Sequence, residues 1–272
     1  GLRTAAGSGR RSTLIAIAST LVFALVIVLV VANAPGWPAF KEAFFNREVF
    51  RESLDVIPEA FLVNVKIFLI AEVLILPLAL LIAVLRSLPG PVFFPLRALA
   101  VVYADLFRGV PTILVIYMLG FGIPALGLSW MPIDTLFWGI VALVLVYSAY
   151  VSEVYRAGIE SVHPSQDAAA RSLGLSHLQA LRFVVLPQAV RRVIPPLLND
   201  FIGLTKDTAL VGLLGVVEAF RQSQIESANT FNFTPYVVTA ILFILLTIPL
   251  ARLTDWLVAR DRRRQLAAAG AQ

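Results

Sequence analysis

The chain alternates between long apolar runs and shorter segments that hold most of its charges. A helix that crosses a bilayer needs about 20 mostly apolar residues. Six stretches fit this length, so the pattern predicts an all-α integral membrane protein with about six transmembrane helices. The predicted spans are residues 14–34, 59–85, 98–121, 136–156, 196–217 and 235–257.

The first apolar run, residues 14–31, follows a small basic tail at 1–13 that ends near Arg10 and Arg11. Residues 32–34 read Ala-Asn-Ala, which looks like a signal-peptidase site. The apolar core of a cleaved signal peptide is usually about 7 to 15 residues long, and this run is longer. Its length favours a retained helix over a signal peptide, which stays the alternative.

Residues 35–58 mix aromatic side chains with charges. This composition predicts an extracytoplasmic segment that lies at the membrane interface, and a simple solvated loop fits equally well. The core that follows, residues 59–257, contains five of the predicted helices and one long polar loop at 158–195. Residues 258–272 form a basic tail.

Composition agrees with a membrane protein. Of 272 residues, 59% are hydrophobic and 14% are charged, with a mean hydropathy of +0.86. A soluble domain carries nearer a quarter charged residues. Cysteine is absent from the sequence, which excludes disulfide bonds and thiolate chemistry.

The net charge of +5 follows membrane topology and does not indicate a nucleic-acid partner. Positive residues accumulate in cytoplasmic segments of membrane proteins. The proposed outer segments hold four basic residues, Lys41, Arg47, Arg51 and Arg221. The distribution predicts a multi-pass membrane protein with both termini in the cytoplasm. The proposed inner segments hold Arg3, Arg10, Arg11, Arg86, Arg97, Arg171, Arg182, Arg191, Arg192, Arg260, Arg262, Arg263 and Arg264.

The loop at 158–195 carries the start and stop signals of two short helices. Pro164 suits a first helical turn, and Gly174 suits a left-handed stop. Ser176 and Gln179 form a capping box for the second helix, which Leu186-Pro187 is expected to end or bend. An ordinary amphipathic loop helix would show the same signals.

This loop also resembles a known family. Ala168-Ala169-Ala170, Gly174 after three further residues, and Val184-x-Leu186-Pro187 after nine more resemble the EAA loop of bacterial ABC importer permeases. The flanking motifs resemble the polar amino acid subfamily, and the resemblance covers roughly Phe61 to Leu257. These motifs are Tyr103-x-x-x-Phe107-Arg108-Gly109-x-Pro111, Ser148-Ala149-Tyr150-x-x-Glu153-x-x-Arg156-x-Gly158-Ile159, Leu186-Pro187-Gln188-Ala189, Pro195-Pro196-Leu197-x-Asn199 and Lys206-Asp207-Thr208.

The resemblance implies a type I-like ABC permease fold with cytoplasmic coupling helices, in a bacterial plasma (inner) membrane. It implies two ATPase subunits, which bind ATP and Mg in place of this chain. It also implies a second permease subunit, identical or related, and an extracytoplasmic binding protein that delivers an amino acid. The residues it assigns to ATPase coupling lie within 162–187 and are Gln166, Asp167, Ala168, Ala169, Ala170, Gly174, Leu186 and Pro187.

Two positions depart from the family pattern. The usual glutamate falls at Ala168, with Asp167 one residue earlier, and the usual glycine before Gln166 is Ser165. One residue along a helix turns a side chain by about 100°. Asp167 therefore cannot point where the glutamate would, and the polar contact must be altered or supplied by the partner.

Polar residues inside the predicted spans are candidates for a substrate path, because buried charges in lipid normally face a partner, the bundle interior or water. Asp105 and Arg108 are three residues apart and could pair, either along a path or as a structural ion pair. Glu153 and Arg156 could instead brace the loop, and Lys206-Asp207 could be a structural pair. The candidate path residues are Asn64, Asp105, Arg108, Glu153 and Asn199.

The sequence predicts a transport subunit without catalytic or metal-ligating residues. It lacks a phosphate-binding G-x-x-x-x-G-K-[ST] loop, and its two histidines, His163 and His177, both lie in the polar loop. One alternative is a proton- or ion-coupled secondary transporter of small polar solutes that uses Glu72, Asp105 or Asp207. A membrane scaffold is a weaker alternative, because it has little use for charged residues inside its spans.

Overall fold

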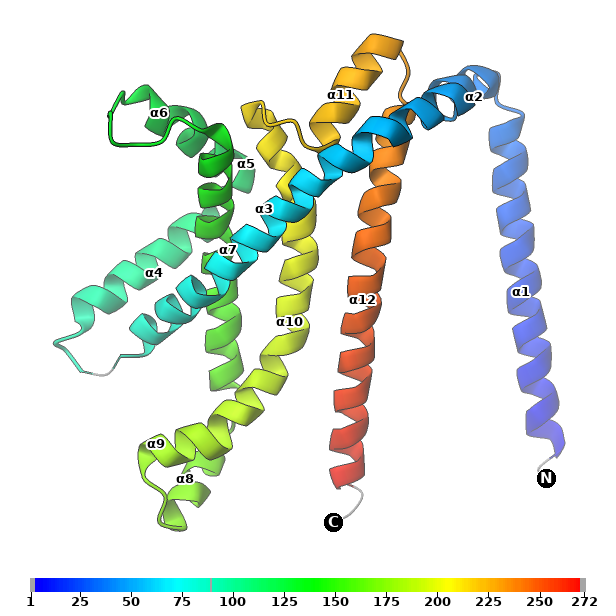
Figure 1. Ribbon diagram of the computed structural model, residues 1–272. Helices are drawn as coiled ribbons and strands as arrows, with labels where there is room; N and C mark the ends of the chain where they lie inside the picture. Colours follow the sequence, from blue (N-terminus) through cyan, green and yellow to red (C-terminus); the bar gives the residue numbers. More distant parts are fainter. Residues whose placement is uncertain (1–2, 89, 270–272) are drawn as a thin grey trace.

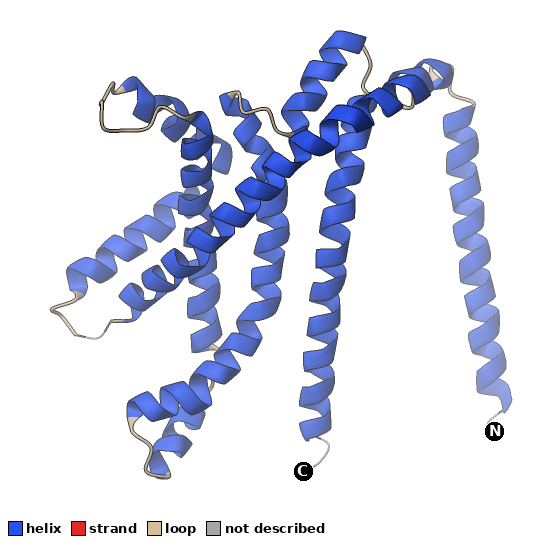
Figure 2. Cartoon of the chain, in the orientation of Figure 1, coloured by secondary structure: helices blue, strands red, loops and turns tan. Residues whose placement is uncertain are grey.

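The computed structural model describes residues 3–88 and 90–269, and these residues form helices and turns without a strand (Figures 1 and 2). The all-α prediction is therefore confirmed. The elements are α1 (Arg3–Ala32), α2 (Trp37–Phe44), α3 (Arg47–Ser87), α4 (Phe94–Gly109), α5 (Thr112–Tyr117), the π-helix η1 (Met118–Gly122), α6 (Ile123–Ala125), α7 (Thr135–Glu160), α8 (Pro164–Ser172), α9 (His177–Ala180), the π-helix η2 (Leu181–Val185), α10 (Leu186–Asp207), the 3-10 helix η3 (Thr208–Leu214), α11 (Ala219–Thr230) and α12 (Thr234–Ala269).

Four helices in the described part of the chain are long and apolar enough to cross a membrane, and a bent pair adds a fifth candidate. The four correspond to the predicted first, second, fourth and sixth spans. The predicted third span is bent by 105° between α4 and α5–α6. The predicted fifth span lies in α10 and η3, and charged residues such as Asp200 and Lys206 leave it outside this apolar set.

The second span starts earlier than its apolar pattern indicates. Asn46 lies before α3, and its side chain accepts hydrogen bonds from the N–H groups of Glu48 and Val49. This cap starts the helix at Arg47, about three turns before the predicted start at residue 59. The predicted outer segment 35–58 is therefore mostly helical, formed by α2 and the first turns of α3.

The core lies where α3, α7 and α10 pack together. Its fully buried side chains include Ile75 from α3, Leu143 and Val146 from α7, and Leu204 from α10. Gly158 of α7 permits a close approach, because a Cβ atom there would collide with Val193 of α10. Helix α7 thus supplies the centre against which the other core helices are positioned.

Helix α1 stands apart from this core (Figure 1), and none of its most apolar window is buried. An apolar helix exposed on all sides fits lipid as its surroundings. In Figure 1 the N-terminal end of α1 and the C-terminal end of α12 lie at the same end of the molecule as the turn between α8 and α9. Helices α2, α6 and α11 lie at the opposite end.

Candidate functional site

Helix α8 has the start and stop that its sequence indicates. Pro164 lies in its first turn, and His163 caps it by accepting a hydrogen bond from the N–H of Ser165 at 3.2 Å. Gly174 has φ +89, and the N–H of Leu175 donates to the carbonyl of Ala170 at 3.3 Å. The predicted glycine stop is confirmed, since an L side chain rarely adopts this conformation.

The predicted capping box is also present. The N–H of Ser176 donates to the Gln179 side chain at 2.9 Å, and the N–H of Gln179 donates to the Ser176 hydroxyl at 3.3 Å. Of the two outcomes expected at Leu186-Pro187, an end or a bend into the next span, the end does not occur: the second helix passes through η2 into α10. Pro187 falls in the first turn of α10, where a residue without an N–H costs little.

We call residues 162–187 the coupling hairpin, after the role that the family resemblance implies for them. Its first helix directs Ala170 inward, where it is 4% exposed, and leaves Gln166, Ala168 and Ala169 on the surface. Leu173 is 85% exposed. The hairpin therefore presents small residues and exposed large apolar side chains, Leu173 and Phe183 among them, outside the bundle.

Two contacts lie where the coupling hairpin meets the bundle. The guanidinium of Arg192 on α10 donates to the carbonyl of Ser161, which follows the end of α7. Val162 and Val185, at the two ends of the hairpin, are buried together with Ala189. A force on α8 would thus reach both α7 and α10.

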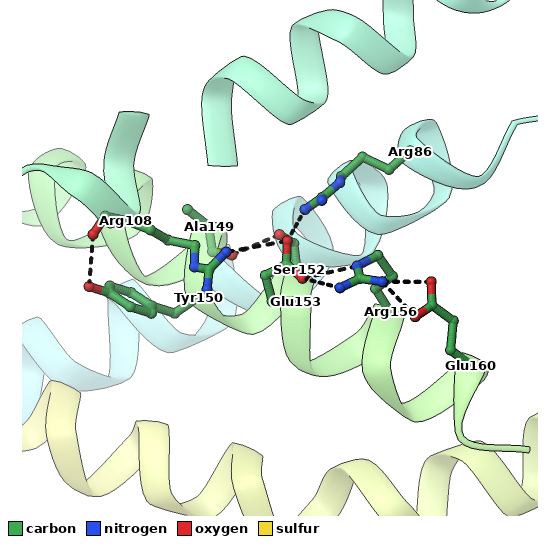
Figure 3. Close-up of polar contacts among 8 residues, drawn as sticks. All are labelled: Arg86, Arg108, Ala149, Tyr150, Ser152, Glu153, Arg156 and Glu160. Carbon is green, nitrogen blue, oxygen red and sulfur yellow. Dashed lines mark hydrogen bonds and ion pairs between the residues drawn. The ribbon is translucent and has the colours of Figure 1, made fainter. Parts of the chain in front are cut away.

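A second polar site surrounds Glu153 near the same end of α7 (Figure 3). Its carboxylate accepts a hydrogen bond from Arg86 of α3 and from Arg156 of α7, the latter at 2.9 Å from Nε. Arg108 of α4 lies 3.5 Å from the same carboxylate. Arg156 also contacts Glu160. We call these five residues the Glu153 cluster, and it joins three helices.

The Glu153 cluster corrects the pairing expected from the sequence. Arg108 pairs with Glu153, whereas Asp105 is exposed and has no ion pair with a described residue. Arg86 was not a candidate, although it is a direct partner of Glu153. Its signal was present, because Arg86 ends one predicted span and Glu153 nears the end of another that runs in the same direction.

Asn64 lies in a separate network and is 2% exposed. Its amide donates to Thr208 at 3.1 Å and to Glu218 at 2.9 Å, and its carbonyl accepts from the N–H of Ala219 at 3.0 Å. Glu218 is fully buried and caps α11 through the N–H groups of Phe220 and Arg221. Burial raises the pKa of Glu218, and these hydrogen bonds oppose the rise.

The remaining sequence candidates do not converge with these sites. Asn199 is exposed on α10, and its neighbour Asp200 has a buried oxygen without a hydrogen-bond partner in the described chain, as does Glu72 of α3. Asp207 accepts a hydrogen bond from Tyr147 at 3.0 Å and does not form the ion pair expected with Lys206. Among the candidate path residues, the structure thus brings together Arg108 and Glu153.

Comparison with known proteins identifies the family. The family model for the inner membrane component of binding-protein-dependent transport systems matches residues 75–263. The chain belongs to this family. The permease is 36% identical over 184 residues to the probable glutamine ABC transporter permease protein GlnM of Bacillus subtilis, covering 67% of this chain and 82% of the relative.

Other relatives agree with the family assignment. The permease is 33% identical to the probable amino-acid ABC transporter permease protein PatM of Vibrio harveyi, covering 67% of this chain and 81% of PatM. A crystal structure of an amino acid ABC transporter with histidines superposes with a TM-score of 0.71 at 30% identity, covering 77% of this chain and 95% of that one. The MetNI methionine ABC transporter shares the fold: it is 20% identical, with a TM-score of 0.55, and the match covers 76% of this chain and 94% of that one.

These relatives confirm the resemblance to polar amino acid importer permeases and the type I permease fold. The permease is a multi-pass membrane transport subunit of an ABC importer, and ATP hydrolysis belongs to a separate subunit. A gradient-coupled secondary transporter is not favoured. The matched range 75–263 includes the coupling hairpin and the Glu153 cluster, but it begins after Asn64.

Proposed function

We propose that the permease forms the translocation path of an ATP-driven importer of polar amino acids. The observation that carries this proposal is the coupling hairpin, a capped and exposed turn within a chain of this family. Relatives named as glutamine, arginine and amino-acid permeases support the substrate class. The substrate-path residues proposed are Asn64, Asp105, Arg108, Glu153 and Asn199.

In this proposal, the coupling hairpin faces the cytoplasm together with both termini. It binds one of two ATPase subunits, which hold ATP and Mg. Ala168, Ala169 and Gly174 leave room for a groove to approach the backbone, and Leu173 supplies an apolar anchor. Gln166, Asp167, Ala170, Leu186 and Pro187 complete the proposed coupling set.

The import cycle requires further partners. A second permease subunit, identical or related, encloses the path, and an extracytoplasmic binding protein delivers the amino acid. ATP binding closes the ATPase pair and moves the two hairpins. The movement reaches α7 and α10 through Ser161 and Arg192, and the helices tilt between inward-open and outward-open packings. A ligand shifts such states only by its differential affinity for them.

The test is to purify tagged permease gently from its host and identify the co-purifying proteins by mass spectrometry. The wild-type chain is expected to carry an ATPase. Ala169→Phe places a large side chain on the exposed face of α8, so it should reduce both ATPase recovery and ATP-driven amino acid uptake at least tenfold. The matched control is Ala228→Phe on the exposed surface of α11, at the opposite end of the molecule, which should retain the ATPase.

Retention of the ATPase and of ATP-driven uptake by Ala169→Phe would overturn the coupling role of the hairpin. Uptake that depends on an imposed proton gradient and not on ATP would instead support a secondary transporter. Loss of the ATPase from both variants would indicate that the bulky side chains act through folding. The melting temperature of each variant tests that explanation.

A further inference from the structure

A hollow of about 510 Å³ lies where the end of α3, the start of α4 and the end of α7 meet, and the proposed transport cycle does not use it. It is lined by basic and apolar side chains. Its three guanidinium groups come from α3, α4 and α7, and its apolar side chains come from α4. The lining residues are Arg86, Arg97, Arg156, Phe94, Ala98, Val101 and Val102.

The charges around the hollow do not balance. Arg86 and Arg156 share the carboxylate of Glu153, and Arg156 also pairs with Glu160. Arg97 has no carboxylate partner among the described residues. Three guanidinium groups at the hollow therefore face two carboxylates, and Arg108, which also lies near Glu153, adds a further positive charge.

Arg97 is fixed in place with part of its donor capacity unused. Its Nη1 donates to the carbonyls of Leu88 and Gly90 at 2.7 and 2.8 Å. A guanidinium has five N–H donors. Within the described part of the chain, the Arg97 hydrogen bonds are those of Nη1, so the donors of Nε and Nη2 are unused. Arginine presents such donors in a planar fork that fits two oxygens of a phosphate. Arg97 is thus held ready for an anionic oxygen ligand.

The apolar side of the hollow continues along the outer surface of α4. Phe94 is 63% exposed and Val102 is 61% exposed, and Leu99 beside them is 66% exposed. Helix α4 is half of a bent pair that is apolar enough to cross a membrane. Apolar side chains on this surface fit an acyl chain, and arginines at the end of a membrane-spanning helix can reach the lipid headgroups.

We propose that this hollow binds an anionic phospholipid, with its phosphate on Arg97 and an acyl chain along Phe94 and Val102. Basic pockets between transmembrane helices bind anionic headgroups by the same combination of charge and depth. The lipid would brace α4 against α3 and α7 beside the Glu153 cluster. The site is independent of which solute the permease carries.

The test is native mass spectrometry of delipidated full-length permease, with any subunits that co-purify, titrated with phosphatidylglycerol. Phosphatidylcholine and inorganic phosphate serve as separate probes. Arg97→Gln removes the charge but keeps donors for the two loop carbonyls. It should weaken phosphatidylglycerol binding about fivefold, the ratio that corresponds to about 1 kcal/mol for one arginine at an anionic surface. The matched control Arg252→Gln, at an exposed arginine on α12, should leave binding unchanged.

Equal binding of phosphatidylcholine, or unchanged phosphatidylglycerol binding in Arg97→Gln, would overturn the proposal. Inorganic phosphate that displaces the lipid at equal concentration would assign the site to a free anion. Because the sequence lacks cysteine, a single spin label at Val102→Cys in lipid nanodiscs distinguishes lipid from protein. Oxygen dissolved in the bilayer is expected to speed the relaxation of this spin label. A label protected from oxygen would contradict lipid contact and show that another subunit covers α4.

Discussion

The coupling hairpin and the Glu153 cluster are built in opposite ways. Hydrogen bonds between residues three to five positions apart close the turn of the hairpin, such as those between Ser176 and Gln179 and between Leu175 and Ala170. The cluster instead joins side chains from three helices, and Arg86 and Glu153 are 67 residues apart. The hairpin can form locally, whereas the cluster exists only when the bundle is assembled.

The comparison predicts different responses to substitution. A change in the Glu153 cluster should loosen contacts among α3, α4 and α7, because one carboxylate serves all three. A change in the coupling hairpin should alter the shape of a local turn and leave the bundle core in place. A substitution at Glu153 should have the largest effect, one at Gly174 a smaller effect, and one at Ser176 the smallest.

Glu153→Gln should have the largest effect, because it leaves Arg86, Arg108 and Arg156 without their shared negative charge. Removing one partner of a fully buried ion pair costs about 3–5 kcal/mol. The Glu153 side chain is 17% exposed, so partial hydration reduces the expected loss of stability to about 2 kcal/mol. Thermal unfolding in detergent measures this loss.

Glu160→Gln is the matched control for that variant. Glu160 pairs with the same Arg156, but its side chain is 61% exposed and it joins no third helix. Removing the charge of Glu160 should change the free energy of unfolding by less than about 0.5 kcal/mol. Equal melting temperatures for the two variants would show that the cluster does not hold the three helices together.

Gly174→Ala should have the second-largest effect, and this effect should be confined to the coupling hairpin. Gly174 has φ +89, and a Cβ atom there would meet nothing within 4 Å, so the cost is conformational and not steric crowding. A residue with a Cβ in this region costs about 1–2 kcal/mol. The α8–α9 turn should open, and ATPase recovery should fall severalfold while the melting temperature changes little.

Gly109→Ala is the matched control, since its Cβ would also meet nothing within 4 Å but its φ is not positive. It should retain the ATPase. Equal ATPase recovery for Gly174→Ala and Gly109→Ala would mean that the left-handed turn is not needed for docking. A large loss of melting temperature in Gly174→Ala would mean that the hairpin contributes to the bundle and is not a local unit.

The same contrast explains what the sequence could predict. The stop at Gly174 and the box at Ser176 and Gln179 depend on neighbours in the chain, and both were predicted correctly. The pairing of Arg108 was wrong, because helical spacing made Asp105 an available partner while Glu153 lay on another helix. Choosing between them required the packing of α4 against α7.

Burial was the other property that local patterns did not reveal. Glu218 follows an apolar stretch and begins a polar segment of the sequence, but it is fully buried against Asn64. The early start of α3 had a local signal in the Asn46 cap, which the apolar pattern outweighed. Long-range contacts and burial therefore mark the part of the site that sequence reasoning could not reach.

Ser176→Ala should have the smallest effect and is the most direct test of local construction. It removes the hydroxyl that accepts from the N–H of Gln179, and such caps contribute about 1 kcal/mol or less. Ser172→Ala is the matched control, because its hydroxyl donates to the carbonyl of Ala168 within the helix and caps nothing. Hydrogen exchange should accelerate severalfold at α9 in Ser176→Ala and remain unchanged at α7. Acceleration that reached α7 would mean that the hairpin and the bundle unfold together. The coupling hairpin would then be an extension of the core, and a local perturbation of the hairpin would change the packing around Glu153.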